Sequence, residues 1–205
     1  MSTRIAGLTG ATLDTTPQVC HECVWWQSHS GRAADKKRWM RGTEEEWGTW
    51  GSVYYDDDER LLGSMQYGPS GLFPRAAELP AGPPSDDSVL VTCAYLTDPT
   101  KPWVLQSLFL TAIGEARERG ARALEAFAYR YPDGDRSTER LHVHKTIFPS
   151  DFLSDFGFLT VRMSGRVELA RLELGGLQPV LEGAREKVLR VVRDAFVPAP
   201  APQRP

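Results

Sequence analysis

The chain lacks a hydrophobic run of the length needed to cross a membrane. Its 205 residues are 41% hydrophobic, and no apolar stretch approaches the roughly 20 residues that span a bilayer as a helix. The N-terminal sequence, MSTRIAGLTGATLDTT, contains no apolar segment of the kind found in secretory signal peptides. These absences predict a cytoplasmic protein without a membrane partner.

Cysteine and basic charge are also scarce. The chain has three cysteines, an odd number that fits a reducing compartment better than a disulfide framework. Its 24 Lys and Arg residues are outnumbered by 27 Asp and Glu residues, which leaves a net charge of -3. A dispersed, slightly acidic charge argues against a general nucleic-acid-binding protein. The length and hydrophobic content suit one domain with a substantial core.

Between residues 89 and 127 the sequence predicts strand, helix and strand. Val89–Leu96 is apolar and β-branched at its start, as a buried strand should be. From Trp103 onward, apolar residues recur three and four positions apart, which predicts a helix that Gly120 ends. Ala121–Phe127 then begins a second strand. A single short helix between two strands indicates a βαβ crossover and a parallel pair.

The residues before this unit predict three further kinds of segment. The expected strands are Ile5–Leu8, the apolar end of Cys20–Gln27, Ser52–Tyr55 and Leu61–Tyr67, the last two forming a hairpin. Arg32–Trp47 is expected to be a helix, with its basic residues Lys36, Lys37 and Arg38 on a solvated face. Gly68–Asp87 is rich in proline and is expected to be an extended loop without a regular element. That loop forms either a wall of a binding cleft or a surface connection.

The residues after this unit predict a short helix, two closing strands and a C-terminal helix. The short helix begins near Pro149, and Gly157 ends it. The closing strands are expected at Phe158–Met163 and Val167–Leu174. The expected organisation is a domain at 1–177, an amphipathic helix at 178–196 that packs on the domain or on a partner chain, and a disordered proline-rich tail at 197–205.

In this order the segments resemble the GNAT superfamily of acyltransferases. The motifs that carry the resemblance are LVTCAYL (Leu90–Leu96), EARERGARALEAF (Glu115–Phe127), DFLSDFGFLTVR (Asp151–Arg162) and VELARLEL (Val167–Leu174). The segments CHECVWWQ and EWGTWGSVYY further resemble an actinobacterial-type branch of that superfamily. The resemblance covers residues 1 to 177. It implies an α/β fold with a mixed, strongly twisted sheet flanked by helices.

The function implied by this resemblance is transfer of an acetyl group from acetyl-CoA to an amine of a small molecule or a protein. The amine would attack the thioester directly within a ternary complex. Backbone groups of Ala94, Tyr95 and Leu96 would pair with the pantetheine arm and polarise the thioester carbonyl. No metal is expected, and a homodimer is expected from the strand edges and the C-terminal helix. The alternative is a GNAT-like module that has lost or altered acetyl-CoA use and acts in binding or dimerisation.

The turn that would hold the pyrophosphate contains no glycine. In the family, glycines at this turn let backbone N–H groups approach the phosphates at the start of a helix. Here the turn is Thr100–Ser107, in which Pro102 has no N–H to donate. The residues expected to meet the cofactor are Lys101, Trp103, Gln106 and Ser107. In the alternative interpretation, Trp103 fills the groove as a core residue.

Three residues are the candidate acid and base groups. Glu125, in the second strand, is expected to be the general base, and the alternative is a polar residue on the outer face of the strand. The tyrosine that many family members use as general acid is replaced by Leu153. Tyr129 and Tyr131 are the substitutes for it, and the alternative for both is packing or surface exposure.

Cys20 and Cys23 have the spacing of a zinc ligand pair, and His142 and His144 are residues that could complete the site. A redox-active thiol pair is a second interpretation, and a structural pair is a third. The N-terminal region is also rich in tryptophan, with Trp25, Trp26, Trp39, Trp47 and Trp50. These rings form either the core or an aromatic-lined acceptor pocket.

Overall fold

The computed structural model describes residues 4–29, 32, 34–98, 100–131, 144–145 and 147–175. The chain divides into two units, residues 1–175 and 176–205. The C-terminal helix predicted at 178–196 and the tail predicted at 197–205 therefore lie outside the described residues. Within the described part of the chain, no helix is both long and apolar enough to cross a membrane.

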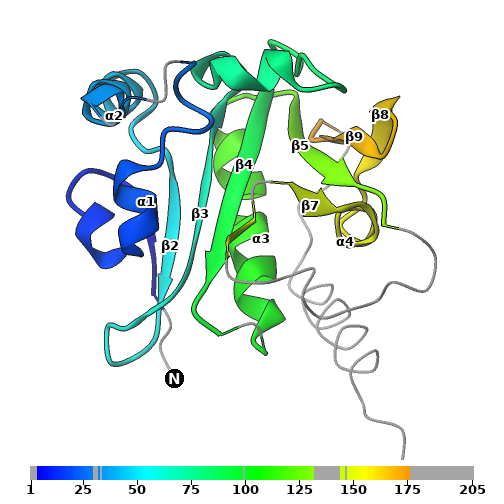
Figure 1. The fold of residues 1–205 in the computed structure, drawn as a ribbon. Helices are drawn as coiled ribbons and strands as arrows, with labels where there is room; N and C mark the ends of the chain where they lie inside the picture. The colour runs from blue at the N-terminus through cyan, green and yellow to red at the C-terminus, as the bar shows by residue number, and fades with distance from the viewer. Residues whose placement is uncertain are drawn as a thin grey trace, which may run out of the picture. The chain divides into compact units, whose positions relative to one another are not determined.

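One twisted sheet organises the described residues (Figure 1). Its main path runs β1-β2-β3-β4-β5-β9-β8, and two short strands pair off this path, β6 with β4 and β7 with β5. The strands are β1 (Arg4–Gly7), β2 (Gly51–Tyr55), β3 (Leu61–Pro69), β4 (Ser88–Leu96), β5 (Ala123–Tyr129), β6 (His144–Lys145), β7 (Phe148–Pro149), β8 (Leu159–Ser164) and β9 (Val167–Glu173). Along the main path only β4 and β5 are parallel, so the sheet is mixed, as predicted.

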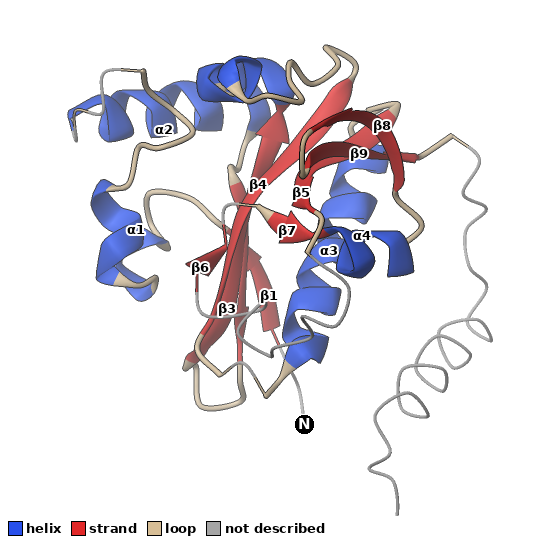
Figure 2. Cartoon of the chain, turned by 45° about the vertical axis from the view of Figure 1, so that its right-hand side comes forward, coloured by secondary structure: helices blue, strands red, loops and turns tan. Residues whose placement is uncertain are grey.

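Helices flank the sheet, as Figure 2 shows. The α-helices are α1 (Gln18–Glu22), α2 (Ala34–Trp47), α3 (Pro102–Glu118) and α4 (Ser150–Asp155), and the 3₁₀ helices are η1 (Leu13–Thr15), η2 (Ser70–Leu72) and η3 (Pro74–Glu78). The crossover helix α3 buries the predicted apolar face, which includes Val104, Leu108 and Ala112. Gly120 follows α3 with a φ of 76°, a left-handed conformation that glycine adopts without steric cost and that ends the helix there.

Two sequence predictions about the N-terminal half are wrong. The segment predicted as a strand at Cys20–Gln27 is instead the short helix α1 followed by a turn, closed by the Gln27 N–H donating to the Val24 carbonyl oxygen. Val24 and Trp26 are both buried, which reproduces the two-residue alternation of a strand without any strand pairing. The loop predicted at Gly68–Asp87 contains η2 and η3, which are ordered because they pack on the core.

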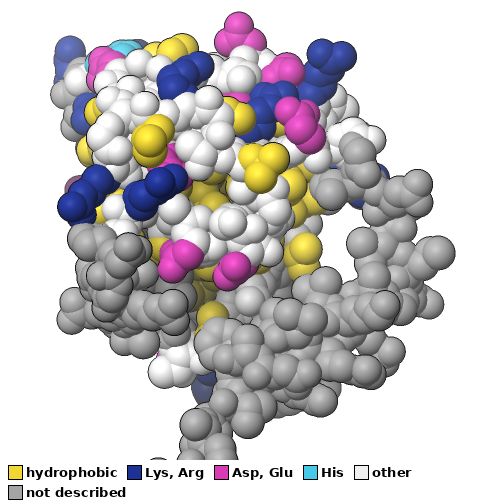
Figure 3. Space-filling view, turned by 90° about the vertical axis from the view of Figure 1, so that its right-hand side faces the viewer, with side chains coloured by type: hydrophobic (Ala, Val, Ile, Leu, Met, Phe, Trp, Pro, Cys, Tyr) yellow, Lys and Arg dark blue, Asp and Glu magenta, His cyan; other side chains and the backbone are white. Residues whose placement is uncertain are grey.

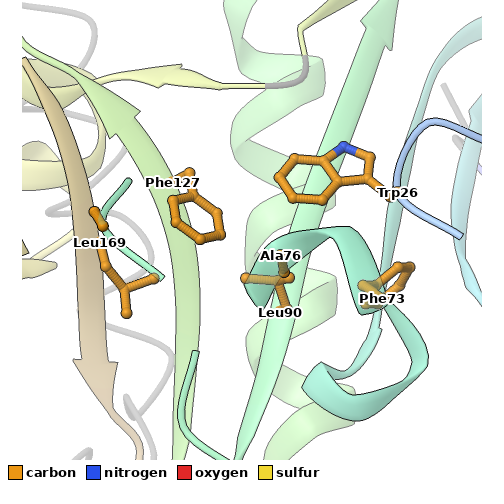
Figure 4. Packing of buried hydrophobic residues seen from close by; sticks show 7 residues of the cluster. Trp26, Phe73, Ala76, Leu90, Phe127 and Leu169 are labelled. Carbon is orange, nitrogen blue, oxygen red and sulfur yellow. The ribbon is translucent and has the colours of Figure 1, made fainter. Parts of the chain in front are cut away.

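The core on one face of the sheet is built around Trp26 (Figure 4). Its ring stacks on Phe127 with the ring centroids 5.8 Å apart. The cluster is completed by Phe73, Ala76, Ala81, Leu90 and Leu169. On the α3 side, Phe109 is fully buried and its ring contacts Phe148, Phe152, Phe156 and Phe158. Aromatic packing therefore anchors both faces of the central strands.

Candidate functional site

The central feature of the candidate site is the point where β4 and β5 separate. The two strands pair in parallel register only from Ser88, opposite Ala123, to Val91, opposite Ala126. Directly afterwards β4 has a bulge, because Val91 faces Tyr67 and Cys93 faces Gln66, which leaves Thr92 as an extra residue. A bulge bends its strand and increases the local twist. The bulge thus accounts for the divergence of β4 from β5 seen in Figure 1.

Two short strands of the same chain pair with the diverging strands, β6 with β4 and β7 with β5. In β6, Lys145 pairs with Ala94 and His144 pairs with Tyr95 in antiparallel register. In β7, Phe148–Pro149 pairs with the end of β5 in parallel register. The edge of β4 that was predicted to bind the pantetheine arm is therefore paired with β6. The role predicted for Ala94, Tyr95 and Leu96 stays a prediction, and it requires β6 to leave this edge.

The carboxylate of Asp98 stabilises the turn before α3 through hydrogen bonds within the turn. The Oδ1 atom of Asp98 accepts hydrogen bonds from the Thr100 N–H at 2.9 Å and from the Thr100 hydroxyl at 2.6 Å. The Nζ atom of Lys101 lies 3.7 Å from Oδ2 of Asp98. These hydrogen bonds with Thr100 lower the pKa of Asp98. Asp98 thus already engages donors that a phosphate group would use at this turn.

Trp103 is not a core residue. Its side chain is 40% exposed, and its ring meets Tyr54 edge to face with the centroids 5.5 Å apart. The interpretation in which Trp103 fills the groove as core is therefore wrong. Ser107 donates its hydroxyl to the Trp103 carbonyl oxygen at 2.9 Å, and Gln106 is half-buried. The predicted contacts of Lys101, Trp103, Gln106 and Ser107 with a cofactor stay predictions.

Glu125 is enclosed in the tightly paired part of the sheet. Its side chain is 0% exposed, so the alternative of an outer-face polar residue is wrong. Its two oxygens accept hydrogen bonds from the N–H and hydroxyl of Ser85 at 2.8 and 2.9 Å and from the Ser88 hydroxyl at 3.0 Å. The Nη1 atom of Arg171 lies 3.0 Å away. A general base must reach the acceptor amine. Ser85, Ser88 and Arg171 instead hold the Glu125 carboxylate within the paired part of the sheet. Its role as base stays a prediction.

Tyr129 and Tyr131 stand at the diverging end of β5. Their rings contact each other edge to face with the centroids 5.0 Å apart, and both side chains are half-buried. Tyr129 is opposite Pro149 of β7. Tyr129 therefore lies at the end of β5 that pairs with β7, and Tyr131 follows two residues later. Their predicted role as general acid stays a prediction.

A small pocket lies against β4 beside this gap, and sequence reasoning missed its central residue. The pocket has a volume of about 30 Å³ and lies among α1, α2, β3 and β4. Its lining includes Trp26, Gln27, Lys36 and Cys93, together with Ala94 and Tyr95 of β4; we call it the Lys36 pocket. Lys36 was predicted to lie on a solvated face, which is wrong, because it is only 4% exposed. The buried Met40 and Thr43, four and seven residues later, mark that inward face at helical spacing.

The ammonium group of Lys36 has an unusual set of neighbours. Its Nζ atom donates a hydrogen bond to the Cys23 carbonyl oxygen at 3.1 Å. It lies 5.5 Å from the ring centroid of Trp39 and 5.1 Å from that of Trp50, within cation–π range. Burial lowers the pKa of Lys36, because the charged form loses its hydration.

The three cysteines are free thiols near this lysine. Burial raises the pKa of Cys20, and it raises the pKa of Cys93 to about 12. Because the thiolate is the reactive form, the raised pKa of Cys20 disfavours its reaction as one member of a redox-active pair. Within the described ranges, no group of three or more His, Cys, Asp or Glu residues could hold a metal ion. His142 lies outside the described residues, and for His144 the backbone alone is described.

Comparisons with known proteins connect this geometry to one fold. No family model matches the chain, and no curated protein matches it. Among solved structures, yncA from Salmonella typhimurium with its cofactor acetyl-CoA has a TM-score of 0.52 at 15% identity and covers 89% of this chain and 99% of its own. The PaiA N-acetyltransferase from Thermoplasma acidophilum in complex with coenzyme A has a TM-score of 0.49 at 14% identity and covers 84% and 99%.

A third similar structure is the ribosomal-protein-S18-alanine N-acetyltransferase from Escherichia coli. It has a TM-score of 0.48 at 12% identity and covers 88% of this chain and 99% of its own. Identities this low establish the fold and not the chemistry. The mixed sheet flanked by helices is the GNAT acetyltransferase fold, as the sequence motifs predicted.

Proposed function

We propose that this protein is an N-acetyltransferase that moves an acetyl group from acetyl-CoA to an amine of a small molecule or a protein. The observation that carries the proposal is the divergence of β4 from β5 directly after the bulge at Thr92. This divergence provides a strand edge with the start of α3 at one end and the Lys36 pocket beside it. The same fold in yncA is described with its cofactor acetyl-CoA.

Acetyl-CoA would bind along β4 in place of β6. The residues present fit the pantetheine arm, because β6 pairs with Ala94 and Tyr95 in antiparallel register and an extended arm could use the same backbone groups. When bound, the thioester supplies the activated acetyl group, and backbone groups of Ala94, Tyr95 and Leu96 would polarise its carbonyl. The phosphates would lie near the start of α3, at Lys101, Gln106 and Ser107.

Proton transfers would involve residues of β5 and the segment after it. Tyr129 and Tyr131 are the proposed donors to the leaving thiolate, because they stand at the open end of the gap. Glu125 is the proposed base for the amine. That role needs one of its oxygens to be released from Ser85, Ser88 or Arg171.

The second candidate function is a GNAT-like binding module without turnover. Two observations favour it: β6 already pairs with the edge of β4, and Asp98 already engages the donors of Thr100. In this function the chain would act through a partner or through a second copy.

Titration calorimetry with acetyl-CoA separates the two functions. Saturable heat of binding, followed by release of free coenzyme A when a mixture of amines is added, is the result expected of the enzyme. Absence of binding at millimolar acetyl-CoA would leave only the binding module. Coenzyme A serves as the control ligand, since it tests the nucleotide and pantetheine contacts without the acetyl group.

A homodimer is a further part of the proposal, and β8 is the surface that supports it. Leu159, Val161 and Met163 alternate along this edge strand and are 73%, 53% and 54% exposed. Figure 3 shows hydrophobic side chains set among charged ones on the face that carries β8. An exposed apolar edge strand is a common site of association. Light scattering after gel filtration measures the oligomeric state.

A further inference from the structure

Lys36 is a buried cation without an anionic partner in the described part of the chain. No carboxylate among the described residues lies within ion-pair distance of its Nζ atom, whereas Arg130, Arg171 and other basic residues do pair with carboxylates. Its Nζ atom donates a hydrogen bond to one carbonyl oxygen, that of Cys23, and an ammonium group carries three donors. Buried charges in proteins are normally paired. Lys36 is therefore placed to bind an anion that the described residues do not supply.

Two further polar atoms of the Lys36 pocket lack partners among the described residues. The indole Nε1 atom of Trp26 and the Oε1 atom of Gln27 are buried and make no hydrogen bond there. Both side chains are more than nine-tenths buried, at 1% and 8% exposure. Figure 4 shows the indole nitrogen of Trp26 on the edge of the ring that faces away from Ala76 and Leu90. Two residues of the pocket lining thus carry an unpartnered neutral donor and an unpartnered neutral acceptor, in addition to the ammonium group of Lys36.

The location of the pocket connects these atoms to the proposed reaction. Ala94 and Tyr95 belong both to its lining and to the strand edge proposed to hold the thioester. A molecule that enters the pocket from the gap would therefore place its nearest atoms beside the acetyl group. A hydrogen bond fixes the position of the Gln27 side chain, because its Nε2 atom donates to Oε1 of the buried Gln66 at 2.7 Å.

We propose that the Lys36 pocket binds the carboxylate of the acceptor, so that the acceptor is an amine carrying a carboxylate, of which a free amino acid is the simplest. This inference rests on the proposed acetyl transfer and names the substrate class of that site. Lys36 and the Trp26 N–H would bind the carboxylate. The acceptor nitrogen would donate one hydrogen to Oε1 of Gln27.

The size and charge of the pocket favour this occupant over a simple amine. A volume of about 30 Å³ has room for a group of one or two water molecules' size, which matches a carboxylate and not a ring. An ammonium group entering the pocket would be repelled by Lys36, whereas a carboxylate forms charge-assisted hydrogen bonds with it. The remainder of the acceptor would extend into the gap between β4 and β5.

The test compares matched acceptors and matched variants. Free amino acids and the amines that correspond to them without the carboxylate are supplied with acetyl-CoA, and the rate of coenzyme A release is measured for each pair. The variants are Lys36→Met, Lys36→Arg, Gln27→Leu and, as control, Lys37→Met at the exposed neighbouring position. Binding of N-acetyl amino acids to the protein without acetyl-CoA is followed by the fluorescence of Trp26 and Trp50 in the pocket wall.

The expected result is a preference for amino acids over the plain amines that Lys36→Met reduces roughly ten- to hundredfold, mainly through KM. Lys36→Arg should retain much of this preference, Gln27→Leu should weaken it, and Lys37→Met should leave it unchanged. Equal use of both acceptor classes by the original protein and by Lys36→Met would overturn the inference while acetyl transfer stands.

The two proposals can fail separately. If no amine is acetylated but N-acetyl amino acids bind and Lys36→Met removes that binding, the carboxylate site stands and the transferase proposal fails. If N-acetyl amino acids do not bind and no amino acid is preferred, the carboxylate site is wrong. Should Lys36→Met not fold, as judged by circular dichroism, Gln27→Leu and the matched acceptors decide the question alone.

Discussion

The Nη1 atom of Arg171 lies 3.0 Å from Oε1 of Glu125. Glu125 is on β5, in the part of this strand that pairs with both β4 and β9. Arg171 also pairs with Asp87 at 3.0 Å and with Glu173 at 2.6 Å. Because Glu125 is completely buried, its negative charge depends on this arginine and on the hydroxyl groups of Ser85 and Ser88. This network holds β4 and β5 together just before they separate, and it makes Glu125 a structural residue whatever its part in catalysis.

Substitution of Glu125 should therefore cost stability. We expect Glu125→Ala to lower the free energy of unfolding by about 3–5 kcal/mol, because Arg171 and the two serines lose a buried partner. Glu173→Gln, which removes an exposed partner of the same arginine, should cost under about 1 kcal/mol. Urea unfolding measures both. A variant Glu125→Gln that folds normally but loses acetyl transfer would instead support the predicted role as general base.

Arg171 also makes stability depend on pH through Asp87. Its hydrogen bond lowers the pKa of Asp87 below the ordinary value of 3.8. When folding lowers the pKa of a carboxyl group, the ionised group stabilises the folded protein at any pH above its unfolded-state pKa. This stabilisation is lost as the pH falls through the folded-state pKa. We expect unfolding free energy to decline below about pH 4, and the decline to be slightly smaller in Asp87→Asn. Because Asp87 is exposed, the difference should stay under about 1 kcal/mol. Identical pH profiles for the two proteins would contradict this.

Trp103 and Phe109 provide a matched comparison on α3. Phe109→Ala should lower the unfolding free energy by about 3–5 kcal/mol, since the ring is fully buried among four phenylalanines. Trp103→Ala should cost only about 1 kcal/mol, because the ring is 40% exposed and makes an aromatic contact with Tyr54. Thermal and urea unfolding measure both variants. Equal losses of unfolding free energy in the two variants would mean that Trp103 contributes to stability as a core residue does.

The pairing of β6 with β4 should oppose cofactor binding. Replacing both His144 and Lys145 by proline removes the backbone N–H groups of β6. We expect this variant to bind acetyl-CoA roughly three- to tenfold more tightly by calorimetry, the equivalent of one lost backbone hydrogen bond. Replacing both residues by alanine retains the N–H groups and is the control. If the proline and alanine variants bind alike, acetyl-CoA does not use this edge of β4.

The thiol of Cys93 should be unreactive in the folded protein. Burial raises its pKa to about 12, so almost none of it is thiolate near neutral pH. We expect iodoacetamide at pH 7.5 to leave Cys93 unlabelled until the protein is unfolded in urea, with peptide mass spectrometry locating the label. Rapid labelling of the folded protein would restore a reactive-thiol interpretation of this cluster.

Much of the fold was predictable because its signals are local. The strand at residues 88–96, the helix at 102–118 and the strand at 123–129 follow apolar periodicity, proline positions and Gly120. The prediction at Cys20–Gln27 failed because alternating burial of Val24 and Trp26 comes from a turn packing on the core, which periodicity cannot distinguish from a strand. The site was less predictable, because Lys36 resembles any surface lysine in a charged segment.

By itself, the amino-acid sequence determined the unit of β4, α3 and β5, the GNAT-type motifs and the glycine-free turn before α3, since each depends on neighbouring residues. Only the tertiary structure decided which groups meet. It placed Lys36 against Trp50 and β4, Arg171 against Glu125, and β6 on the edge that acetyl-CoA would need. Burial and strand pairing join residues far apart in the chain, so their energies are set by packing and not by any local pattern.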